Sequence, residues 1–373
     1  MATVISLVSY PFLPARVGGQ RGIALFSKYF ARYQKLICVT TKNNDPSSAE
    51  GYEVINILSD SALRYINFFY FFTLRRIIRE KKATHLLLEH PYYGWLGVLL
   101  KWVCRVKLIV HSHNIEGLRW KTLGKWWWRL LWLYEKYTHR HADYNFFIHD
   151  ADKQYGIDHF GLSASSCITM TYGIEWNSIP DAEEIRKARF QIRRRFQMNE
   201  QDKILFFNGA FNHIPNLHAL EKIIDIINPL LLEEGKVPYK IIICGRDIPA
   251  AILQSSHPNM IIAGFVENID LFFKGSDLFI NPVTEGGGIK TKLVEALGYN
   301  LNAVSTKSGA IGVNPDWCNG KLLLCEDDDW HSFAHLIQEA ASLKADLPMV
   351  YFDHFYWGYS TQKAAQFIEP AKK

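Results

Sequence analysis

The stretch that decides the fold is Asn281-Pro-Val-Thr-Glu-Gly-Gly-Gly-Ile-Lys-Thr-Lys-Leu-Val-Glu-Ala-Leu-Gly298. The short apolar run at 277–280, just before it, predicts a buried strand. The glycines at 286–288 predict a turn without side chains, which lets phosphates approach the backbone closely. Residues 289–297 contain no Pro or Gly and predict a helix that ends at Gly298. A strand, a glycine turn and a helix together point backbone N–H groups at an anion.

Two lysines stand at the start of this predicted helix. Lys290 and Lys292 have the wrong charge for the helix dipole, so we expect a negative ligand to offset them. Glu295 follows Lys292 by three residues and falls on the same helix face. A further strand at 301–306 places the turn at the carboxyl edge of a parallel sheet, where open α/β sheets bind ligands. The alternative is an ordinary strand-turn-helix unit with solvated lysines.

The whole chain shows the same alternation of strands and helices. Strands are expected at 4–9, 36–40, 52–58, 85–89 and 106–110, with helical segments between them. This pattern predicts an α/β fold with doubly wound parallel sheets. The 373 residues are too many for one ordinary core, so we expect two domains.

Composition excludes several classes of protein. Hydrophobic residues make up 48% and charged residues 21%, as in a globular domain. A net charge of +5 is too weak and too dispersed for a nucleic-acid partner. The six scattered cysteines show no metal-like spacing and indicate reduced thiols in a cytoplasmic protein. The apolar runs are too short to cross a bilayer, and the N-terminus lacks signal-peptide features.

The strand at 106–110 leads into His111-Ser-His-Asn-Ile-Glu116. Polar residues at the carboxyl end of a parallel strand are candidates for chemistry. The alternative is a histidine that caps the next helix. In the same half of the chain, Gly18 and Gly19 belong to a glycine loop that precedes a helix expected from about Ile23. A plain surface turn is the alternative there.

Residues 118–140 carry an unusual density of Trp, Lys and Arg. We expect one helix with a basic face at Lys121, Lys125, Arg129, Lys136 and Arg140. Leu123 and Leu130 fall on the opposite, apolar side. Such a helix suits an anionic membrane interface. The alternative is a core-packed helix with a solvated basic face.

Four blocks in the second half carry a resemblance to a known family. They are Gly-Phe-Val-Glu-Asn (264–268), Gly-Ser-Asp-Leu-Phe-Ile-Asn-Pro (275–282), Gly-Gly-Ile-Lys-Thr-Lys-Leu-Val-Glu-Ala-Leu (287–297) and Ala-Val-Ser-Thr (303–306). In this order they resemble the nucleotide-sugar half of the retaining GT-B glycosyltransferases of the "glycosyl transferases group 1" family.

The resemblance implies a GT-B fold: two Rossmann-like domains facing a central cleft, with a C-terminal helix that crosses back to the N-terminal domain. We expect an acceptor-side domain at 1–178, a nucleotide-sugar domain at 196–346 and a crossover segment at 347–373. The charged helix at 182–197 is interpreted as the link between the domains.

The resemblance also implies residue roles. His113, with His111 as the runner-up, would contact the transferred sugar. Lys292 would hold the diphosphate, and Glu295 would accept hydrogen bonds from the ribose diol. The remaining donor-binding candidates are Gly18, Gly19, Asn212, Arg246, Phe265, Val266, Gly286, Gly287, Gly288, Ile289 and Lys290.

The sequence departs from the family pattern in two places. Many relatives place an Arg and a Lys after the strand at 203–208, whereas this chain has neither. Asn212, His213 or Asn216 is expected to substitute, with more of the task left to Lys292. The family's first glutamate is also missing, because Glu285 comes two residues too early. Lys290 or the backbone at 286–288 is expected to contact the sugar instead.

The implied activity is transfer of a sugar from a UDP or GDP donor to a hydroxyl of a glycan or lipid-linked acceptor. The resemblance implies retention of configuration, no cofactor and no required metal ion. We expect a cytoplasmic protein, peripheral on the inner face of the plasma membrane, that serves cell-surface polysaccharide or glycoconjugate synthesis. Two alternatives are a nucleotide-sugar 2-epimerase on the same scaffold and an inactive nucleotide-sugar-binding module.

Overall fold

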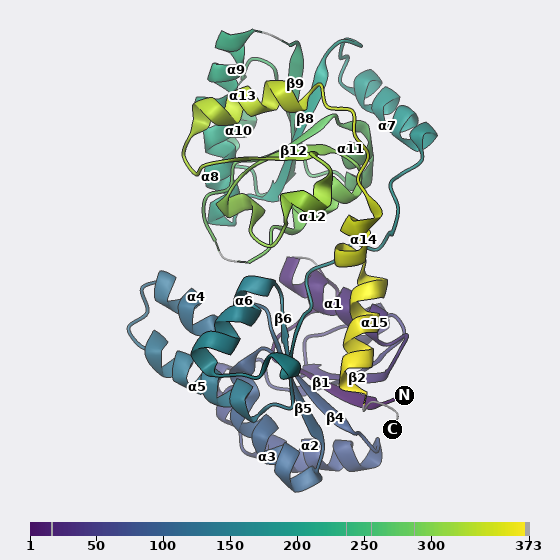
Figure 1. Ribbon diagram of the computed structural model, residues 1–373, viewed down its shortest axis with the longest axis vertical. Helices are drawn as coiled ribbons and strands as arrows, with labels where there is room; N and C mark the ends of the chain where they lie inside the picture. Colours follow the sequence, from purple (N-terminus) through teal and green to yellow (C-terminus); the bar gives the residue numbers. More distant parts are fainter. Residues whose placement is uncertain (16–17, 236, 255, 287, 370–373) are drawn as a thin grey trace. The chain divides into compact units, whose positions relative to one another are not determined.

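The chain folds as two compact units, each built on one parallel sheet (Figure 1). The computed structural model describes residues 1–15, 18–235, 237–254, 256–286 and 288–369. The first unit contains Met1–Glu175 and the segment that begins at Phe355, and the second contains Trp176–His354. The predicted α/β class with two Rossmann-like sheets is confirmed.

The first unit has a seven-stranded sheet in the order β3-β2-β1-β4-β5-β6-β7, with every neighbouring pair parallel. Its inner strands are apolar and almost completely buried, as expected for a sheet covered on both faces, whereas the edge strands β3 and β7 are only partly buried. They are β1 (Thr3–Val8), β2 (Lys35–Thr41), β3 (Glu53–Leu58), β4 (His85–Glu89), β5 (Lys107–Ser112), β6 (Tyr144–Phe147) and β7 (Cys167–Thr169).

Helices cover both faces of this first sheet (Figure 1). The C-terminal helix belongs to this unit and packs against α1. The helices are α1 (Gly18–Phe30), α2 (Phe69–Glu80), α3 (Gly94–Cys104), α4 (Glu116–Thr122), α5 (Trp128–His141), α6 (Asp150–Tyr155) and α15 (Trp357–Ile368).

The second unit has a six-stranded parallel sheet in the order β10-β9-β8-β11-β12-β13. Its strands are β8 (Lys203–Ala210), β9 (Tyr239–Arg246), β10 (Met260–Gly264), β11 (Leu278–Asn281), β12 (Asn302–Thr306) and β13 (Leu322–Cys325). Its helices are α7 (Ala182–Arg195), α8 (Ile214–Lys222), α9 (Asn228–Glu234), α10 (Ala250–Gln254), α11 (Ile269–Gly275), α12 (Thr291–Gly298), α13 (Trp330–Ala340) and α14 (Met349–Phe355).

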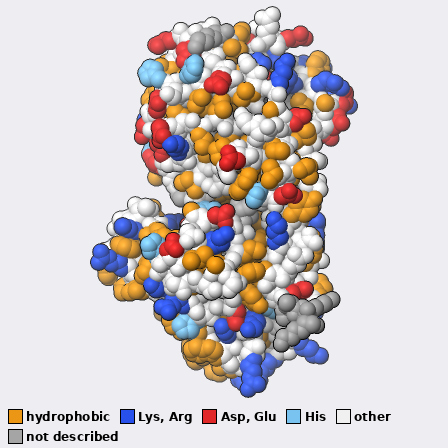
Figure 2. Space-filling view, in the orientation of Figure 1, with side chains coloured by type: hydrophobic (Ala, Val, Ile, Leu, Met, Phe, Trp, Pro, Cys, Tyr) orange, Lys and Arg blue, Asp and Glu red, His pale blue; other side chains and the backbone are white. Residues whose placement is uncertain are grey.

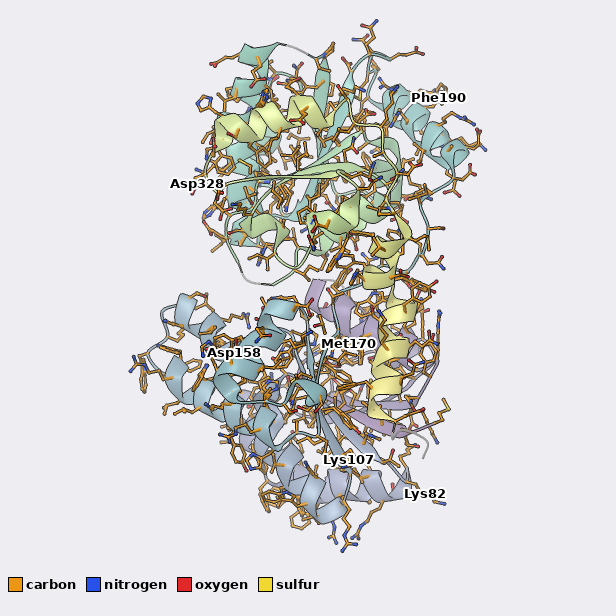
Figure 3. All side chains as sticks on the ribbon, in the orientation of Figure 1. Lys82, Lys107, Asp158, Met170, Phe190 and Asp328 are labelled. Carbon is orange, nitrogen blue, oxygen red and sulfur yellow. The ribbon has the colours of Figure 1, made fainter. Side chains whose placement is uncertain are left out.

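The helix expected to link the domains is instead a packed part of the second unit. Ala188 and Ile192 of α7 are buried, and they lie so close to Gly275 of α11 that a Cβ there would meet them at 2.6–2.9 Å. Only the outer face of α7 is solvated, where Phe190, labelled in Figure 3, is 65% exposed. The high charge of α7 therefore reflects an amphipathic surface helix and not a linker.

Residues 118–140 form two helices, so the prediction of one continuous helix is wrong. Gly124 adopts φ +67° and ends α4, because a left-handed residue does not continue a right-handed helix. The chain then turns back into α5. A Cβ at Gly117 would lie 2.5 Å from that of Trp132, so glycine lets the two helices approach closely.

A buried carboxylate ties this helical hairpin together. The two oxygens of Glu135, in α5, accept the backbone N–H groups of Glu116 and Gly117, each at 2.9 Å. They thus cap the N-terminus of α4 from the neighbouring helix. Leu123 and Leu130, expected on the packed side, are 55% and 64% exposed, because the break at Gly124 changes which faces are covered.

Candidate functional site

Lys290 and Lys292 form the lysine cluster of the second unit. They lie where the order of the strands in the sheet of this unit reverses. β8 and β11 are neighbours in the sheet but are separated in sequence by two other strands, so the loops that follow them diverge there. Ligands of open α/β sheets bind at this position. Asn216, after β8, and Lys292, after β11, meet there, with Lys292 Nζ 3.5 Å from Asn216 Oδ1.

Lys292 is a poorly neutralised cation. It has no ion pair within the described part of the chain, and Asn216 is its hydrogen-bond partner. Burial lowers the pKa of its ammonium, and the charge of Glu295 opposes that shift. Glu295 is itself only 8% exposed and lies three residues further along α12. A second anion would therefore find a partly dehydrated positive charge here.

Lys290 supports the glycine turn next to this cation. Its Nζ donates to the carbonyl oxygens of Gly286 at 2.7 Å and Gly288 at 3.1 Å. Burial, and then the charge of Lys292, lower the pKa of Lys290 to about 8. Gly286 and Gly288 have φ values of +82° and +74°, which favour glycine, while Gly287 falls outside the described residues.

The helix after the turn begins at Thr291, two residues later than predicted. Lys290 occupies the N-cap position and makes no side-chain capping hydrogen bond. Its side chain has no acceptor, so it leaves the first turn of α12 uncapped by a side chain. Ile289 lies beside Gly312, at 3.3 Å from the position of a Cβ there.

The other predicted donor residues lie at the same carboxyl edge, on neighbouring strands. Arg246 ends β9, and its carbonyl accepts the N–H of Phe211 at 2.9 Å. Phe265 and Val266 follow β10, and Phe265 is 66% exposed. Asn212 is exposed in the turn after β8, so Asn216, not Asn212, is the amide that contacts Lys292.

Two further side chains complete this edge. His213 opens α8, and burial followed by the charges of Lys292 and Lys290 lowers its pKa. Glu285, which comes too early to match the family glutamate, forms an exposed ion pair with His218 at 3.0 Å. The structure thus places an imidazole with a lowered pKa beside the two lysines, and a paired carboxylate at 285.

The first unit also has a reversal of strand order, between β1 and β4. The loops after these strands meet through Tyr10 and His90, with Tyr10 Oη 3.1 Å from His90 Nε2. Gly18 and Gly19 were predicted to lie in a loop, but they form the first turn of α1. A Cβ at Gly19 would lie 4.0 Å from Tyr10 Oη, so Gly19 is close to the same loop.

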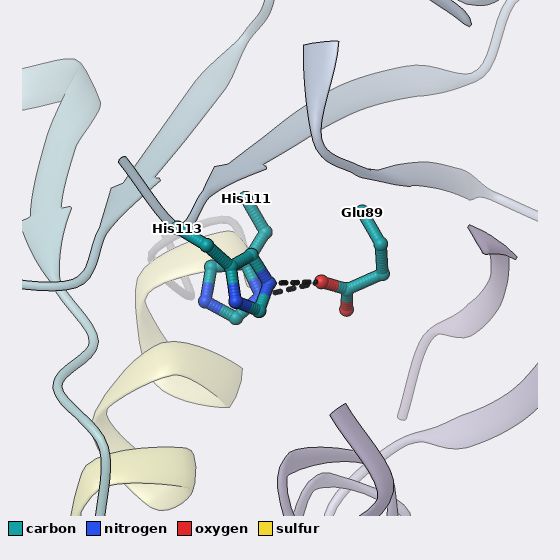
Figure 4. Close-up of side chains that lie close together, drawn as sticks. All are labelled: Glu89, His111 and His113. Atoms are coloured by element: carbon teal, nitrogen blue, oxygen red, sulfur yellow. Dashed lines mark hydrogen bonds and ion pairs between the residues drawn. The ribbon is translucent and has the colours of Figure 1, made fainter. Parts of the chain in front are cut away.

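Glu89 and two histidines form the centre of this edge (Figure 4). Glu89 Oε2 lies 2.8 Å from His113 Nε2 and 3.0 Å from His111 Nδ1. Burial would raise the pKa of Glu89, but the charges of His111 and His113 and the hydrogen bond from His113 outweigh it and lower this pKa. Burial lowers the pKa of His111. Lys107, labelled in Figure 3, marks the opposite, amino end of β5.

A second carboxylate holds the neighbouring side chains in place. Glu116 Oε1 lies 3.4 Å from His90 Nδ1, and Glu116 Oε2 accepts from Tyr92 at 2.6 Å and from Arg119 at 3.2 Å. The ring of His90 stacks on that of His113, with centroids 4.4 Å apart. His90 has a φ of +71°, an uncommon conformation outside glycine that these contacts maintain.

Sequence reasoning singled out His113 and His111 but missed Glu89, His90 and Glu116. A usable signal was present. The predicted strand at 85–89 ends in Glu89-His90, and the next strand ends in His111. Neighbouring parallel strands end at one edge, and the structure pairs Glu89 directly with His111. Two adjacent strands that end in a carboxylate and an imidazole therefore predict a contact.

Two family models match this chain, one in each of its two units. The family model "Glycosyltransferase Family 4" matches residues 18–174, and "Glycosyl transferases group 1" matches residues 202–342. Chitobiosyldiphosphodolichol beta-mannosyltransferase of Debaryomyces hansenii is 24% identical in an alignment of length 269 that covers 65% of this chain. The match spans 57% of that relative's length.

Two solved structures share the fold over nearly the whole chain. A glycosyltransferase from Rickettsia africae ESF-5 superposes with a TM-score of 0.70 at 13% identity, covering 98% of this chain and 97% of that one. The Anabaena protein HepE, in complex with UDP and glucose, superposes with a TM-score of 0.69 at 14% identity, covering 98% and 99%. At these identities the likeness establishes the fold.

The Glu116 network predicts a specific loss of stability in acid. Burial would raise the pKa of Glu116, but His90 and Tyr92 lower it from 4.5 to about 2. Ionised Glu116 therefore stabilises the folded chain above pH 4.5, and this contribution is lost as the pH falls toward 2. We expect the loss of this contribution to lower the unfolding free energy by about 2 kcal/mol between pH 5 and pH 3.

This contribution should disappear in Glu116→Gln, whereas the exposed Glu80→Gln should keep the wild-type pH dependence. Urea unfolding followed by tryptophan fluorescence at pH 3, 4 and 5 measures it. An unchanged pH dependence in Glu116→Gln would show that the carboxylate is not stabilised as described.

Proposed function

We propose that this chain, which belongs to the GT-B glycosyltransferases of the "glycosyl transferases group 1" family, transfers a sugar from a nucleotide diphosphate to an acceptor hydroxyl. The observation that carries this proposal is the lysine cluster of the second unit. Lys292 lies partly buried, without an ion pair among the described residues, beside a glycine turn and the uncapped start of α12. An anionic ligand supplies the charge that the cluster lacks.

The proposed chemistry follows from the leaving group. As the bond between the sugar and the diphosphate breaks, negative charge grows on the diphosphate. Lys292, Lys290 and the N–H groups at the start of α12 stabilise that charge. Two unit charges 4 Å apart attract by about 4 kcal/mol at a dielectric constant near 20, and by about 1 kcal/mol in water. Partial burial of Lys292 therefore makes it effective.

The remaining roles come from the family resemblance and from the contacts of each residue. Glu295 accepts hydrogen bonds from the ribose diol, and Phe265 and Val266 contact the base. His113 contacts the transferred sugar, and its bond to Glu89 at 2.8 Å fixes the orientation of its ring. The transfer proceeds with retention and without a required metal ion.

The donor and acceptor classes follow from the relatives. HepE was solved with UDP and glucose, and the Debaryomyces relative is named a mannosyltransferase acting on a diphosphodolichol. By analogy we propose a UDP or GDP sugar as donor and a glycan or lipid-linked saccharide as acceptor, in the synthesis of a cell-surface polysaccharide or glycoconjugate.

A donor screen tests this function directly. One UDP or GDP sugar should raise the melting temperature of the full chain, since a ligand at a hundredfold excess over its Kd stabilises by about 2.7 kcal/mol. With an acceptor, NMR should show a new glycosidic bond with the donor's anomeric configuration. Release of a free epimerised sugar would identify a 2-epimerase instead. Binding without any turnover would identify an inactive binding module.

Removal of the Lys292 ammonium should weaken donor binding without unfolding the protein. Hydrogen bonds to charged groups contribute about 1.5–3 kcal/mol, so Lys292→Ala should raise the Kd of the donor about 10- to 100-fold. Isothermal titration calorimetry measures this change. The control is Lys274→Ala, which removes a lysine of α11 that is paired with Glu184 of α7. This variant should leave the Kd unchanged. Equal affinities of Lys292→Ala and the wild type would refute the assigned role.

We also propose that the α4–α5 hairpin contacts an anionic membrane surface. No helix in the described part of the chain has the length and apolarity to span a bilayer. The hairpin exposes large apolar side chains, with Trp126 84% and Leu133 56% exposed. Lys and Arg side chains lie among them (Figure 2), and Lys121 Nζ lies 5.0 Å from the ring of Trp128. Peripheral binding to the inner face of the plasma membrane would bring the enzyme to a lipid-linked acceptor.

Charge reversal on the hairpin tests the membrane proposal. Vesicles that contain phosphatidylserine should sediment the protein at low salt, and Lys125→Glu with Arg129→Glu should release it. The matched control is Lys344→Glu with Lys363→Glu, which changes the net charge equally at exposed positions elsewhere. Equal retention of the two double variants, or no sedimentation of the wild type, would contradict a role for the hairpin.

A further inference from the structure

Three side chains of metal-binding type converge at the carboxyl edge of the first sheet. Glu89 ends β4, His111 lies near the end of β5, and His113 follows β5. One ligand atom of each residue lies within 4.8 Å of the others, and Figure 4 shows both imidazoles directed at one carboxylate oxygen. Among the described residues, no other group of His, Cys, Asp or Glu side chains converges in this way.

Hydrogen bonding within the protein does not satisfy this group. His111 is 2% exposed, yet neither of its ring nitrogens has a hydrogen-bond partner among the described residues. Its Nδ1 faces Glu89 Oε2 at 3.0 Å, but without hydrogen-bond geometry. Glu89 Oε1 is likewise buried and without a partner among those residues. A buried polar group left in this state costs about 1–3 kcal/mol.

We propose that Glu89, His111 and His113 form a binding site for a divalent transition-metal ion of the zinc class, with Glu89 Oε2, His111 Nδ1 and His113 Nε2 as ligands. The ion would accept the lone pair of His111 Nδ1, whose contact with Glu89 Oε2 at 3.0 Å lacks hydrogen-bond geometry. Two imidazoles and one carboxylate suit Zn²⁺ or Co²⁺, whereas Mg²⁺ and Ca²⁺ prefer oxygen ligands only.

The geometry requires only a small adjustment. Zn–N and Zn–O bonds of about 2.0–2.2 Å in a tetrahedral site place ligand atoms about 3.3 Å apart. The carboxylate oxygen now lies 2.8 and 3.0 Å from the two nitrogens. Side-chain rotations that widen these two distances, and that bring the two nitrogens, which lie within 4.8 Å of each other, to a similar separation, would admit the ion. Three protein ligands leave a fourth position for water or a ligand, as in open zinc sites.

The surroundings limit what the ion can replace. Its positive charge is opposed by Glu89 and, one layer away, by Glu116, which already holds His90, Tyr92 and Arg119. Metal binding replaces the hydrogen bond between Glu89 and His113, so that the ion and not this bond then fixes the ring of His113, and it leaves the Glu116 contacts in place. It does not depend on the proposed transfer, in which Lys292 offsets the charge of the diphosphate.

Cobalt titration of the full chain tests this site. Co²⁺ in a four-coordinate nitrogen and oxygen site absorbs strongly in the visible range, and one equivalent of Zn²⁺ should abolish that absorption by displacement. We expect the wild type to bind one Co²⁺ per chain. Glu89→Gln and His113→Ala should each raise the Kd for Co²⁺ at least tenfold, while His159→Gln, at an exposed histidine, should leave it unchanged.

Circular dichroism and the melting temperature show whether each variant is folded. His113→Ala changes a partly solvated loop residue, so we expect it to disturb folding less than Glu89→Gln does. Absence of the four-coordinate spectrum in the wild type would overturn the proposal. So would an unchanged Kd in folded His113→Ala, or an equal weakening in His159→Gln, because the bound ion would then be held by surface histidines. None of these readouts requires sugar transfer.

Discussion

A positive charge held partly out of water is the constraint on which the second unit depends. Burial disfavours the ammonium of Lys292, and Glu295, a turn further along α12, compensates only in part. A protein tolerates such an imbalance where a ligand restores neutrality. The surrounding features support that interpretation: a histidine with a lowered pKa at position 213, a turn braced by Lys290, and a helix start without a side-chain cap.

The first unit solves the opposite problem, because it buries negative charge. Glu89 and Glu116 are almost completely inaccessible, and each is held ionised by imidazole, hydroxyl or guanidinium groups. Glu89 and Lys292 occupy the same topological position in their units, at or after the end of a strand that flanks a reversal of strand order. One sheet therefore offers a cationic edge and the other an edge lined with carboxylates and histidines.

Much of this could be predicted from the sequence, because local signals and the fold agree. The run at 277–298 predicted the strand, the turn and the helix, since glycines and apolar periodicity act over a few residues. The contact between Lys292 and Asn216 was harder to predict, because it joins the first turns of two helices across a sequence separation of 76 residues. The pairing of Glu89 with His111 depends on the register between β4 and β5. The predicted bounds of the two strands already place both residues at strand ends.

The incorrect predictions arose where tertiary contacts override periodicity. Heptad-like spacing of basic residues suggested one helix at 118–140, but a left-handed Gly124 and the close packing of Gly117 on Trp132 divide it. The charge of α7 suggested a linker, although its small buried face packs on Gly275. Glycines at 18 and 19 suggested a loop, whereas in the structure they open a helix.

The cap that Glu135 provides has a mechanical consequence for the hairpin that it closes. Glu135, in the middle of α5, accepts two hydrogen bonds from the start of α4. These bonds restrain the aromatic connection between the two helices and make the hairpin rigid. A rigid hairpin loses little conformational freedom on binding, which would favour the membrane contact that we propose for it.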